Sequence, residues 1–195
     1  MSLFDSISAL AGIFGREGHD LGHLTLRAAV PEADLDPEAG RVTALDLYLD
    51  NLDLSDPCVI GGVLGLQLAG REDLPRFQTG RAVIAVGGAL QRSTDWPLTW
   101  VVIAIGEEEA IVVDTATPAC AVHGSIGRVV VPLADRLEDY LRAVVALMRI
   151  ELEHGMEITD DDLTVREEIE AQIRSEITPL LGPQNAEGFL ELHLD

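Results

Sequence analysis

The chain has 195 residues, and its 34 acidic and 13 basic side chains give a formal net charge of −21. All 13 basic residues are Arg, which excludes chemistry that requires a Lys, such as a Schiff base or the Lys of a phosphate-binding loop. The negative charge also excludes a basic groove for nucleic acid and attraction to an anionic membrane, because an acidic surface repels both phosphates and anionic lipids.

Length favours one domain, or one domain with an appendage, since about 100–200 residues per domain is usual. Hydrophobic residues make up 47% of the chain and aromatic residues 4%, so we expect an aliphatic core. The two cysteines, Cys58 and Cys120, do not make a disulfide framework. We see no basic N-terminal region and no apolar run of roughly 20 residues, so we expect no signal peptide, no membrane span and a cytoplasmic location.

The negative charge is concentrated near the end of the sequence. Residues 151–195 hold 13 acids and two Arg, a net charge of −11. Such a run is typical of a solvated face, and a Lys-free acidic composition also suits a protein kept soluble at high salt. The functional alternative is a surface that attracts a basic partner through its electric field. The sequence leaves these interpretations open.

The first 54 residues mix helix and strand signals. Apolar side chains spaced three and four apart predict a short amphipathic helix over residues 2–14. An imperfect alternation predicts a strand over residues 21–30, and the Pro-containing, acidic residues 31–40 predict a loop. Residues 42–54 fit a helix and a strand equally well.

From Cys58 to Trp100 the pattern is typical of strands, with apolar, β-branched runs that are broken by glycine pairs. Two later runs flank a Gly-Glu-Glu-Glu turn at residues 106–109, which predicts a hairpin. The predicted strand segments are 59–68, 81–90, 100–105, 110–115, 120–122 and 128–131.

At Pro132 the apolar period changes from two to about 3.6, which predicts a helix from there through about Glu153. A further helix is predicted from Thr164, with Thr164 and Glu167 as a capping box. Pro179, Gly182 and Pro183 are expected to end that helix, because proline and glycine disfavour its continuation.

A last short helix is predicted over residues 186–194. Strands in the middle of the chain and helices at its end indicate an α+β fold, with a central antiparallel sheet flanked by helices and a helical C-terminal segment. We place the domain at residues 1–154. Residues 155–195 are interpreted as an acidic helical extension packed on or next to it.

Motifs for catalysis, cofactors and metals are weak. The glycines of residues 60–65 lack the spacing of a dinucleotide site, and residues 124–127 are one residue short of a nucleophile elbow. His19 and His23 are four apart, but glycines in the segment disfavour a helix that would present both to a metal. We therefore expect no catalytic residue, no cofactor and no metal.

Two acidic triplets are candidates for a partner surface. The first forms the turn of the predicted hairpin, where it would also protect a sheet edge against aggregation. The second precedes a predicted helix, and its simplest role is a favourable interaction with the N-terminal dipole of that helix. The triplets are Glu107, Glu108 and Glu109, and Asp160, Asp161 and Asp162.

Trp96 and Trp100 are the largest side chains of a chain that is poor in aromatic residues. They flank the start of a predicted strand and are typical of core anchors. The alternative is a paired platform for a carbohydrate or a peptide.

Four short signatures follow one another between residues 95 and 141. Asp95-Trp96 precedes a strand that begins at Trp100, and a second strand ends at Asp114. A His-Gly pair at residues 123–124 follows, and residues 134–141 open a helix. In this order the signatures resemble the SUKH superfamily, which includes bacterial immunity proteins and fungal regulators of cell-wall assembly.

The resemblance implies a compact α+β domain that binds and neutralises a cognate toxin, often a nuclease, and it brings no catalytic residues. Its motif positions are expected first of all to determine the fold. A hydrogen-bonded pair of Asp114 and His123 could fix the His-Gly turn. The motif positions are Asp95, Trp96, Trp100, Asp114, His123 and Gly124.

Three functions are open at this point. The leading hypothesis is a non-enzymatic module of immunity type whose acidic surface occupies a basic, nuclease-like toxin domain. One alternative is a regulatory or scaffold protein that binds a peptide or protein on its Trp side. The other is a hydrolase that uses Asp114 and His123.

Overall fold

The computed structural model of the chain describes residues 2–16, 18–27, 42–55, 57–127, 129–162 and 164–194. The predicted loop at residues 31–40 lies outside these ranges. The described helices are α1 (Leu3–Ile13), α2 (Ala44–Asn51), α3 (Leu74–Phe77), α4 (Leu137–Glu153), α5 (Glu167–Leu181) and α6 (Pro183–His193). The described strands are β1 (Leu24–Leu26), β2 (Leu52–Leu54), β3 (Cys58–Ile60), β4 (Leu66–Leu68), β5 (Val83–Val86), β6 (Ala89–Arg92), β7 (Trp100–Ile105), β8 (Glu109–Asp114), β9 (Ala121–Ile126) and β10 (Val129–Ala134).

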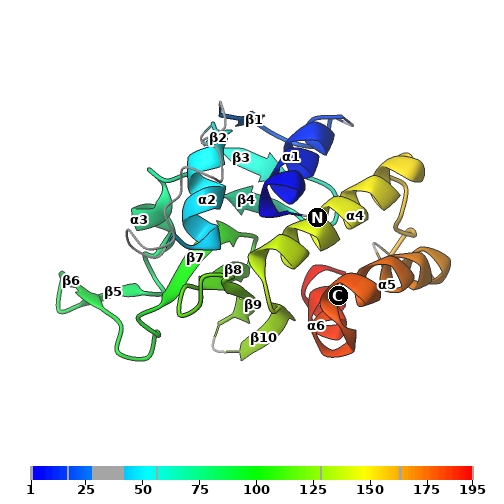
Figure 1. Cartoon of the computed structure of the whole chain (residues 1–195). Helices are drawn as coiled ribbons and strands as arrows, with labels where there is room; N and C mark the ends of the chain where they lie inside the picture. The colour runs from blue at the N-terminus through cyan, green and yellow to red at the C-terminus, as the bar shows by residue number, and fades with distance from the viewer. Residues whose placement is uncertain are drawn as a thin grey trace.

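A six-stranded antiparallel sheet forms the middle of the molecule, with the strand order β10-β9-β8-β7-β4-β3. Two small sheets, β1–β2 and β5–β6, accompany it. Figure 1 shows α1, α2 and α4 across one side of the large sheet, and α5 with α6 beside its β10 end. The predicted α+β fold with a central antiparallel sheet and a helical C-terminal segment is confirmed. No helix in the described ranges combines the length and the apolar composition that a membrane span requires.

The two faces of the sheet are packed differently. Ile111 and Val113 of β8 face the main aliphatic core, which includes Leu147 of α4. Val112 between them faces a second, smaller cluster around Phe77 of α3. Successive side chains of a strand point to opposite faces, so neighbouring residues of β8 enter different clusters. The main core lies under most of the helices, and the smaller cluster lies under the short α3.

The N-terminal elements follow their sequence patterns. The predicted helix over residues 2–14 is confirmed as α1, whose start is capped by Ser2 and Asp5. The undecided residues 42–54 contain both structures, helix α2 followed directly by β2. Of the predicted strand over residues 21–30, residues 21–27 are described, and β1 spans Leu24–Leu26 within them.

The two glycine-broken runs are each a pair of strands rather than one strand. β3 pairs with β4 across a turn at residues 61–65, and β5 pairs with β6 across Gly87 and Gly88. Both glycines of the second turn have positive φ, which a two-residue type I′ turn requires. The predicted hairpin of residues 100–105 and 110–115 is confirmed as β7–β8.

Helix α4 begins at Leu137, five residues after the predicted start at Pro132. Pro132 and Leu133 belong to β10, where Pro132 lies opposite His123. β10 is an edge strand, and an edge position tolerates the missing N–H of a proline. The predicted end at Glu153 is confirmed.

The predicted capping box of Thr164 and Glu167 is wrong. α5 begins at Glu167, and no side chain caps its start. The backbone N–H of Thr164 instead donates to the carboxylate of Asp160 at 3.1 Å, within the preceding loop. The backbone N–H of Thr164 is therefore bonded to a side chain of the loop and is not part of a helix cap.

The predicted end of this helix within Pro179, Gly182 and Pro183 is confirmed at Gly182, but Pro179 itself does not stop α5. Pro179 lies on the exposed side of the last turn, and the helix continues to Leu181. Gly182, with a φ of 79°, separates α5 from α6. The predicted short helix over residues 186–194 is α6, which already begins at Pro183.

The C-terminal helices share the main core with α4 and the sheet. Phe189 of α6 and the isoleucines of α5 are buried in it. α6 lies so close to the sheet that a Cβ on Gly188 would overlap the carbonyl oxygen of Pro132. A Cβ on Gly124 of β9 would likewise overlap the side chain of Leu192 of α6. Residues 167–193 thus pack directly on α4 and on the sheet.

We expect Gly188→Ala to lower the free energy of unfolding by about 1–3 kcal/mol, because backbone atoms must move to admit the methyl group. Gly12→Ala is the matched control, since Gly12 is also helical and has no neighbour within 4 Å of an added Cβ. It should stabilise the protein by up to about 1 kcal/mol through helix propensity. Urea unfolding of both variants measures the difference, and equal effects would contradict the close approach of α6.

Candidate functional site

Four of the six motif residues lie in the sheet, on both of its faces, and Asp95 and Trp96 lie in the loop before β7. Trp100 begins β7 and lies directly opposite Asp114 at the end of β8. His123 pairs with Val112 and faces the side that carries α3, whereas Gly124 faces α6. The His-Gly pair lies inside β9, so the prediction that it forms a turn is wrong.

Trp96, Trp100 and His123 form a continuous strip of rings, which we call the aromatic strip. The two indoles meet edge to face with ring centres 5.6 Å apart, and Trp100 stacks on the imidazole of His123 at 5.1 Å. The indole N–H of Trp96 donates to the carbonyl of Trp100 at 3.2 Å. Both indoles are half-buried against the small cluster around Phe77, as a core anchor would be.

Asp114 and His123 influence each other through charge, and the described contacts include no hydrogen bond between them. The carboxylate of Asp114 accepts instead from the N–H of Ala116 at 2.9 Å. Burial opposes its ionisation, but hydrogen bonds and the nearby His123 hold the pKa of Asp114 below its usual value. Burial lowers the pKa of His123, and Asp114 partly offsets that effect. Asp95 is exposed in the loop before Trp96.

The first acidic triplet is only partly available. Glu107 and Glu108 are exposed in the turn between β7 and β8. Glu109 is the first residue of β8 and not part of the turn, which corrects the prediction. Its half-buried carboxylate folds back and accepts from the N–H of Glu108 at 3.1 Å. Two of the three side chains are therefore open to a partner.

The second triplet lies in the loop between α4 and α5. The carboxylate of Asp160 accepts from the N–H of Asp162 at 3.0 Å and from that of Thr164, so it organises this loop. Glu167 and Glu168 occupy the first turn of α5, and the favourable interaction of this triplet with the dipole of that helix stays a prediction. Asp161 and Asp162 are exposed.

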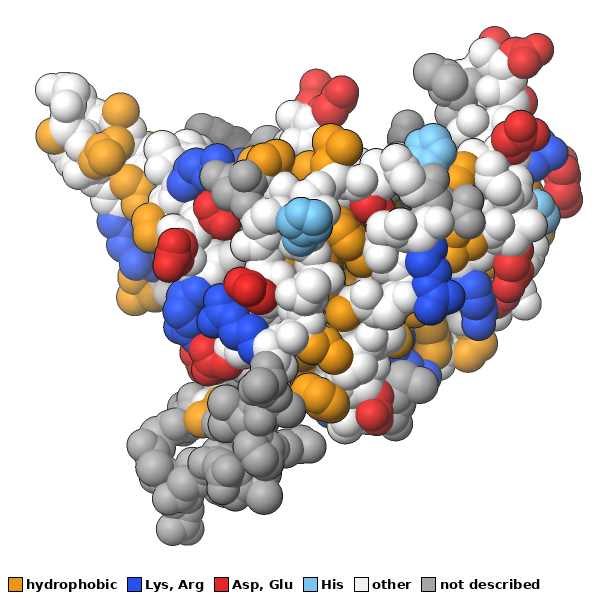
Figure 2. Space-filling view, turned by 90° about the horizontal axis from the view of Figure 1, so that it is seen from above, with side chains coloured by type: hydrophobic (Ala, Val, Ile, Leu, Met, Phe, Trp, Pro, Cys, Tyr) orange, Lys and Arg blue, Asp and Glu red, His pale blue; other side chains and the backbone are white. Residues whose placement is uncertain are grey.

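The triplet belongs to a larger group of exposed carboxylates, which we call the acidic end. Figure 2 shows acidic side chains gathered at the right-hand edge of the molecule, over the end of α4 and the start of α5. The members share exposure and proximity in the chain, and they are Glu153, Glu157, Asp160, Asp161, Asp162, Glu167 and Glu168.

Helix α4 also carries a buried carboxylate, that of Glu151, which the sequence analysis missed. Glu151 is only 2% exposed, and its Oε1 accepts from the N–H of Val63 at 2.8 Å. Gly62 approaches so closely that a Cβ there would overlap the carboxylate. The signal was present, because Glu151 follows Val144 and Met148 at the spacing of the apolar stripe of α4.

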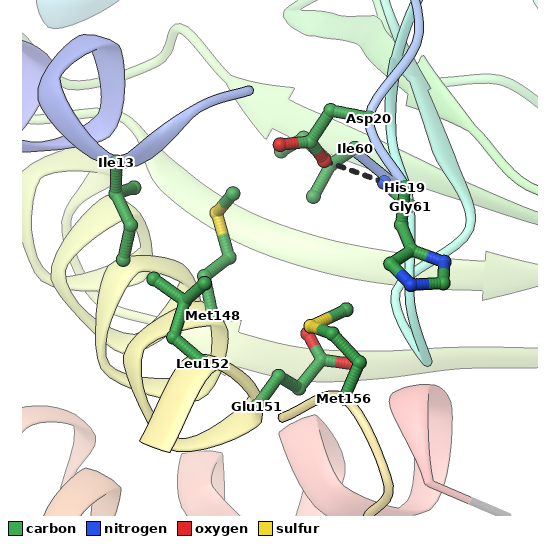
Figure 3. A pocket seen from close by; sticks show the side chains of 9 residues that line it. All are labelled: Ile13, His19, Asp20, Ile60, Gly61, Met148, Glu151, Leu152 and Met156. Carbon is green, nitrogen blue, oxygen red and sulfur yellow. Dashed lines mark hydrogen bonds between the residues drawn. The ribbon is translucent and has the colours of Figure 1, made fainter. Parts of the chain in front are cut away.

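A second carboxylate, that of Asp20, lines the same pocket as Glu151, on its other side (Figure 3). Asp20 accepts from the N–H of Gly61 at 2.8 Å and from that of Gly15 at 2.7 Å. Between the two carboxylates is a cavity of about 20 Å³, also lined by Met156, whose φ of 65° is unusual for a residue with a side chain. That volume holds about one water molecule.

The carboxylate of Glu151 is the titratable group of this pocket whose pKa is shifted most clearly. Burial raises the pKa of Glu151 to about 7, which the N–H of Val63 opposes and the charge of Asp20 reinforces. Within the described ranges, no group of three or more His, Cys, Asp and Glu side chains is arranged to hold a metal ion. Glu151 therefore gains or loses a proton inside the fold near neutral pH.

His193 of α6 is a second buried titratable group. Its Nε2 lies 3.4 Å from the hydroxyl of Tyr140, and the ring meets Phe189 edge to face at 4.6 Å. Its Nδ1 is buried and has no hydrogen-bond partner in the described part of the chain. Burial lowers the pKa of His193 to about 3, so the ring is neutral in the folded protein.

Comparison with protein-family models, with curated proteins and with solved structures finds no match for this chain. The resemblance of residues 95–141 to the SUKH superfamily therefore stays a prediction.

The two buried groups change the free energy of unfolding in opposite directions. The unfolded chain protonates His193 below its usual pKa of 6.5, but the folded protein does so only near 3, so stability is lost as the pH falls below 6.5. The folded protein keeps a proton on Glu151 up to about pH 7, whereas the unfolded chain loses it at 4.5. Stability from Glu151 is therefore lost as the pH rises from 4.5 to 7, and the two effects cancel over most of this window.

We expect Glu151→Gln to remove one of these effects while keeping the acceptor for Val63. Relative to the unmodified protein, the free energy of unfolding of the variant should rise by about 1.4 kcal/mol per pH unit between pH 4.5 and 6.5. Urea unfolding at three pH values measures this slope. Glu191→Gln, at an exposed position of α6, is the control and should follow the unmodified protein throughout. A pH-independent difference for Glu151→Gln would contradict the buried titration.

Proposed function

We propose that the protein is a non-enzymatic binding module that captures a basic protein partner with its acidic end, in the manner of an immunity protein that neutralises a basic, nuclease-like toxin. The observation that carries the proposal is the concentration of seven exposed carboxylates on one end of the molecule (Figure 2). A basic active site that binds nucleic acid presents the complementary charge.

The carboxylates of the acidic end are held on ordered elements, which favours recognition of a protein surface. α5 packs against α4 through buried Ile169, Ile173 and Ile177. The side chain of Asp160 fixes the loop between the helices. Pre-ordering of this kind reduces the conformational entropy that is lost when a partner binds.

Several of the carboxylates are available for intermolecular contacts. In the ranges that the structure describes, Asp161, Asp162, Glu167 and Glu168 form no ion pair. Of the nearby arginines, Arg149 pairs with Glu153 of the acidic end and with Glu176, and Arg174 pairs with Glu170 and Glu187. The guanidinium of Arg166 donates to the backbone carbonyl of Glu157. A basic partner would therefore meet four carboxylates that have no ion pair within the described ranges.

Two further points from the sequence support this function. The resemblance of residues 95–141 to the SUKH superfamily favours toxin neutralisation over a catalytic role. Cys58 and Cys120 are both buried free thiols, which suits the reducing cytoplasm in which such a protein would protect its own cell.

The proposal is tested by the association rate of the immobilised chain with a panel of purified basic nuclease toxin domains. We expect at least one domain to be bound and its nuclease activity inhibited, with an association rate that falls about tenfold or more between low and high salt. Asp161→Asn combined with Asp162→Asn should slow association at low salt and leave it nearly unchanged at high salt.

Glu107→Gln combined with Glu108→Gln is the matched control, because it removes the same number of exposed charges from the other acidic turn. This double variant should retain the association rate to within about twofold. An association rate that is indifferent to ionic strength, or an equal loss in both double variants, would contradict binding by the acidic end.

A further inference from the structure

The hairpin of β5 and β6, residues 83–92, projects from the body of the molecule, and we call it the arm. Figure 1 shows it at the far left, separate from the six-stranded sheet and remote from α5. β5 and β6 pair only with each other as a two-stranded sheet. The arm is tied to the body at its base, where the N–H of Val83 donates to Gln78 and that of Ser93 to Ala82.

The arm is apolar and exposed at the same time. Six of its eight strand residues are hydrophobic, and every side chain of β6 is exposed. Leu90 is 69% exposed and Val86 47%. A two-stranded hairpin is at best marginally stable in water, and natural proteins usually blunt such edges with charges or proline. The arm therefore has the properties of a surface that is covered in its working state.

The outer edge of β6 offers unpaired backbone groups. In a hairpin closed by two residues, the pair next to the turn exchanges hydrogen bonds, and bonded and non-bonded pairs then alternate. Val86–Ala89 and Ile84–Gln91 are thus the bonded pairs. The N–H and C=O groups of Leu90 and Arg92 consequently point away from β5, in the spacing that an added strand requires.

The charge of the arm is opposite to that of the chain. Residues 74–94 contain no acidic side chain in a protein with 34 of them. Arg81 and Arg92 form no ion pair in the described part of the chain, and each donates instead to a backbone carbonyl, of Glu109 and of Leu98. Figure 2 shows apolar side chains and no acidic ones at the tip of the arm.

We propose that the arm binds an acidic, extended polypeptide segment, which adds to the edge of β6 as a third strand. Main-chain hydrogen bonds to Leu90 and Arg92 would supply affinity, apolar side chains would cover Leu90 and Val86, and carboxylates would pair with Arg92. Since charges are screened over about 8 Å at physiological salt, the projecting arm is shielded from much of the negative body. This surface is distinct from the acidic end and takes a partner of opposite sign.

The test uses two blocked seven-residue peptides, Glu-Val-Glu-Val-Glu-Val-Glu and its counterpart with Lys in place of Glu, each titrated into the full-length protein. We expect the acidic peptide to bind at least tenfold more tightly than the basic one. Hydrogen exchange should then show at least tenfold protection of the Leu90 and Arg92 amides, with little change at Gln91, whose amide is already bonded within the hairpin.

Two variants identify the contacts. Leu90→Pro removes an outward N–H and an apolar side chain without removing a hydrogen bond of the hairpin, and it should abolish binding. Arg92→Glu should reverse the preference in favour of the basic peptide. Asp161→Asn combined with Asp162→Asn should leave the peptide affinity unchanged, which separates this inference from the function of the acidic end. Unchanged unfolding curves verify that the variants fold.

Three outcomes would overturn the proposal. The first is no binding of the acidic peptide, and the second is equal binding of both peptides. The third is concentration-dependent protection of the β6 edge without peptide, accompanied by dimers in sedimentation, which would assign the arm to a second copy of the chain.

Discussion

The packing of α4 across the sheet is the interaction on which the rest of the structure depends. Its buried stripe contacts α1 and α2 on one side, β9 and β10 beneath it and α5 beyond it, so both ends of the chain meet on one helix. A chain with a net charge of −21 repels itself, and with few aromatic residues it must offset that repulsion by burying aliphatic side chains. The last residue of α4, Glu153, belongs to the acidic end, so this cluster of carboxylates is attached to a helix that is buried in the main core.

Patterns confined to one element could be predicted from the sequence. The stripe of α4 and the β7–β8 hairpin depend on local periodicity and turn residues, and both are confirmed. The start of α4 was misplaced because Leu133 continues the helical spacing of the stripe, whereas pairing with β9 keeps it in a strand. The capping box of Thr164 is absent because the backbone N–H of Thr164 donates to Asp160, four residues earlier, and not to Glu167.

The candidate sites were predictable only in part, because sequence places charges along the chain but not in space. The acidic residues of the last quarter were visible, but their gathering at one end requires α4 and α5 to lie side by side. Glu151 shares the helical phase of buried residues, yet only the approach of residues 61–63 explains how its carboxylate is tolerated. Nothing local to residues 83–92 reveals that the hairpin leaves the sheet, since a strand in the core would have the same composition.

The separation of charge along the molecule constrains how it associates. The acidic end and the acid-free arm lie at opposite extremes, so one partner of uniform charge cannot be attracted to both (Figure 1). Two copies could place an arm against an acidic end, but the net charge of −21 on each copy opposes the encounter. Added salt weakens both the repulsion between net charges and the attraction between the acidic end and a basic partner. Main-chain hydrogen bonds to β6 and apolar contacts with the exposed Leu90 depend much less on salt. Binding to the arm should therefore depend on ionic strength less steeply than binding to the acidic end, which gives the two surfaces different signatures in solution.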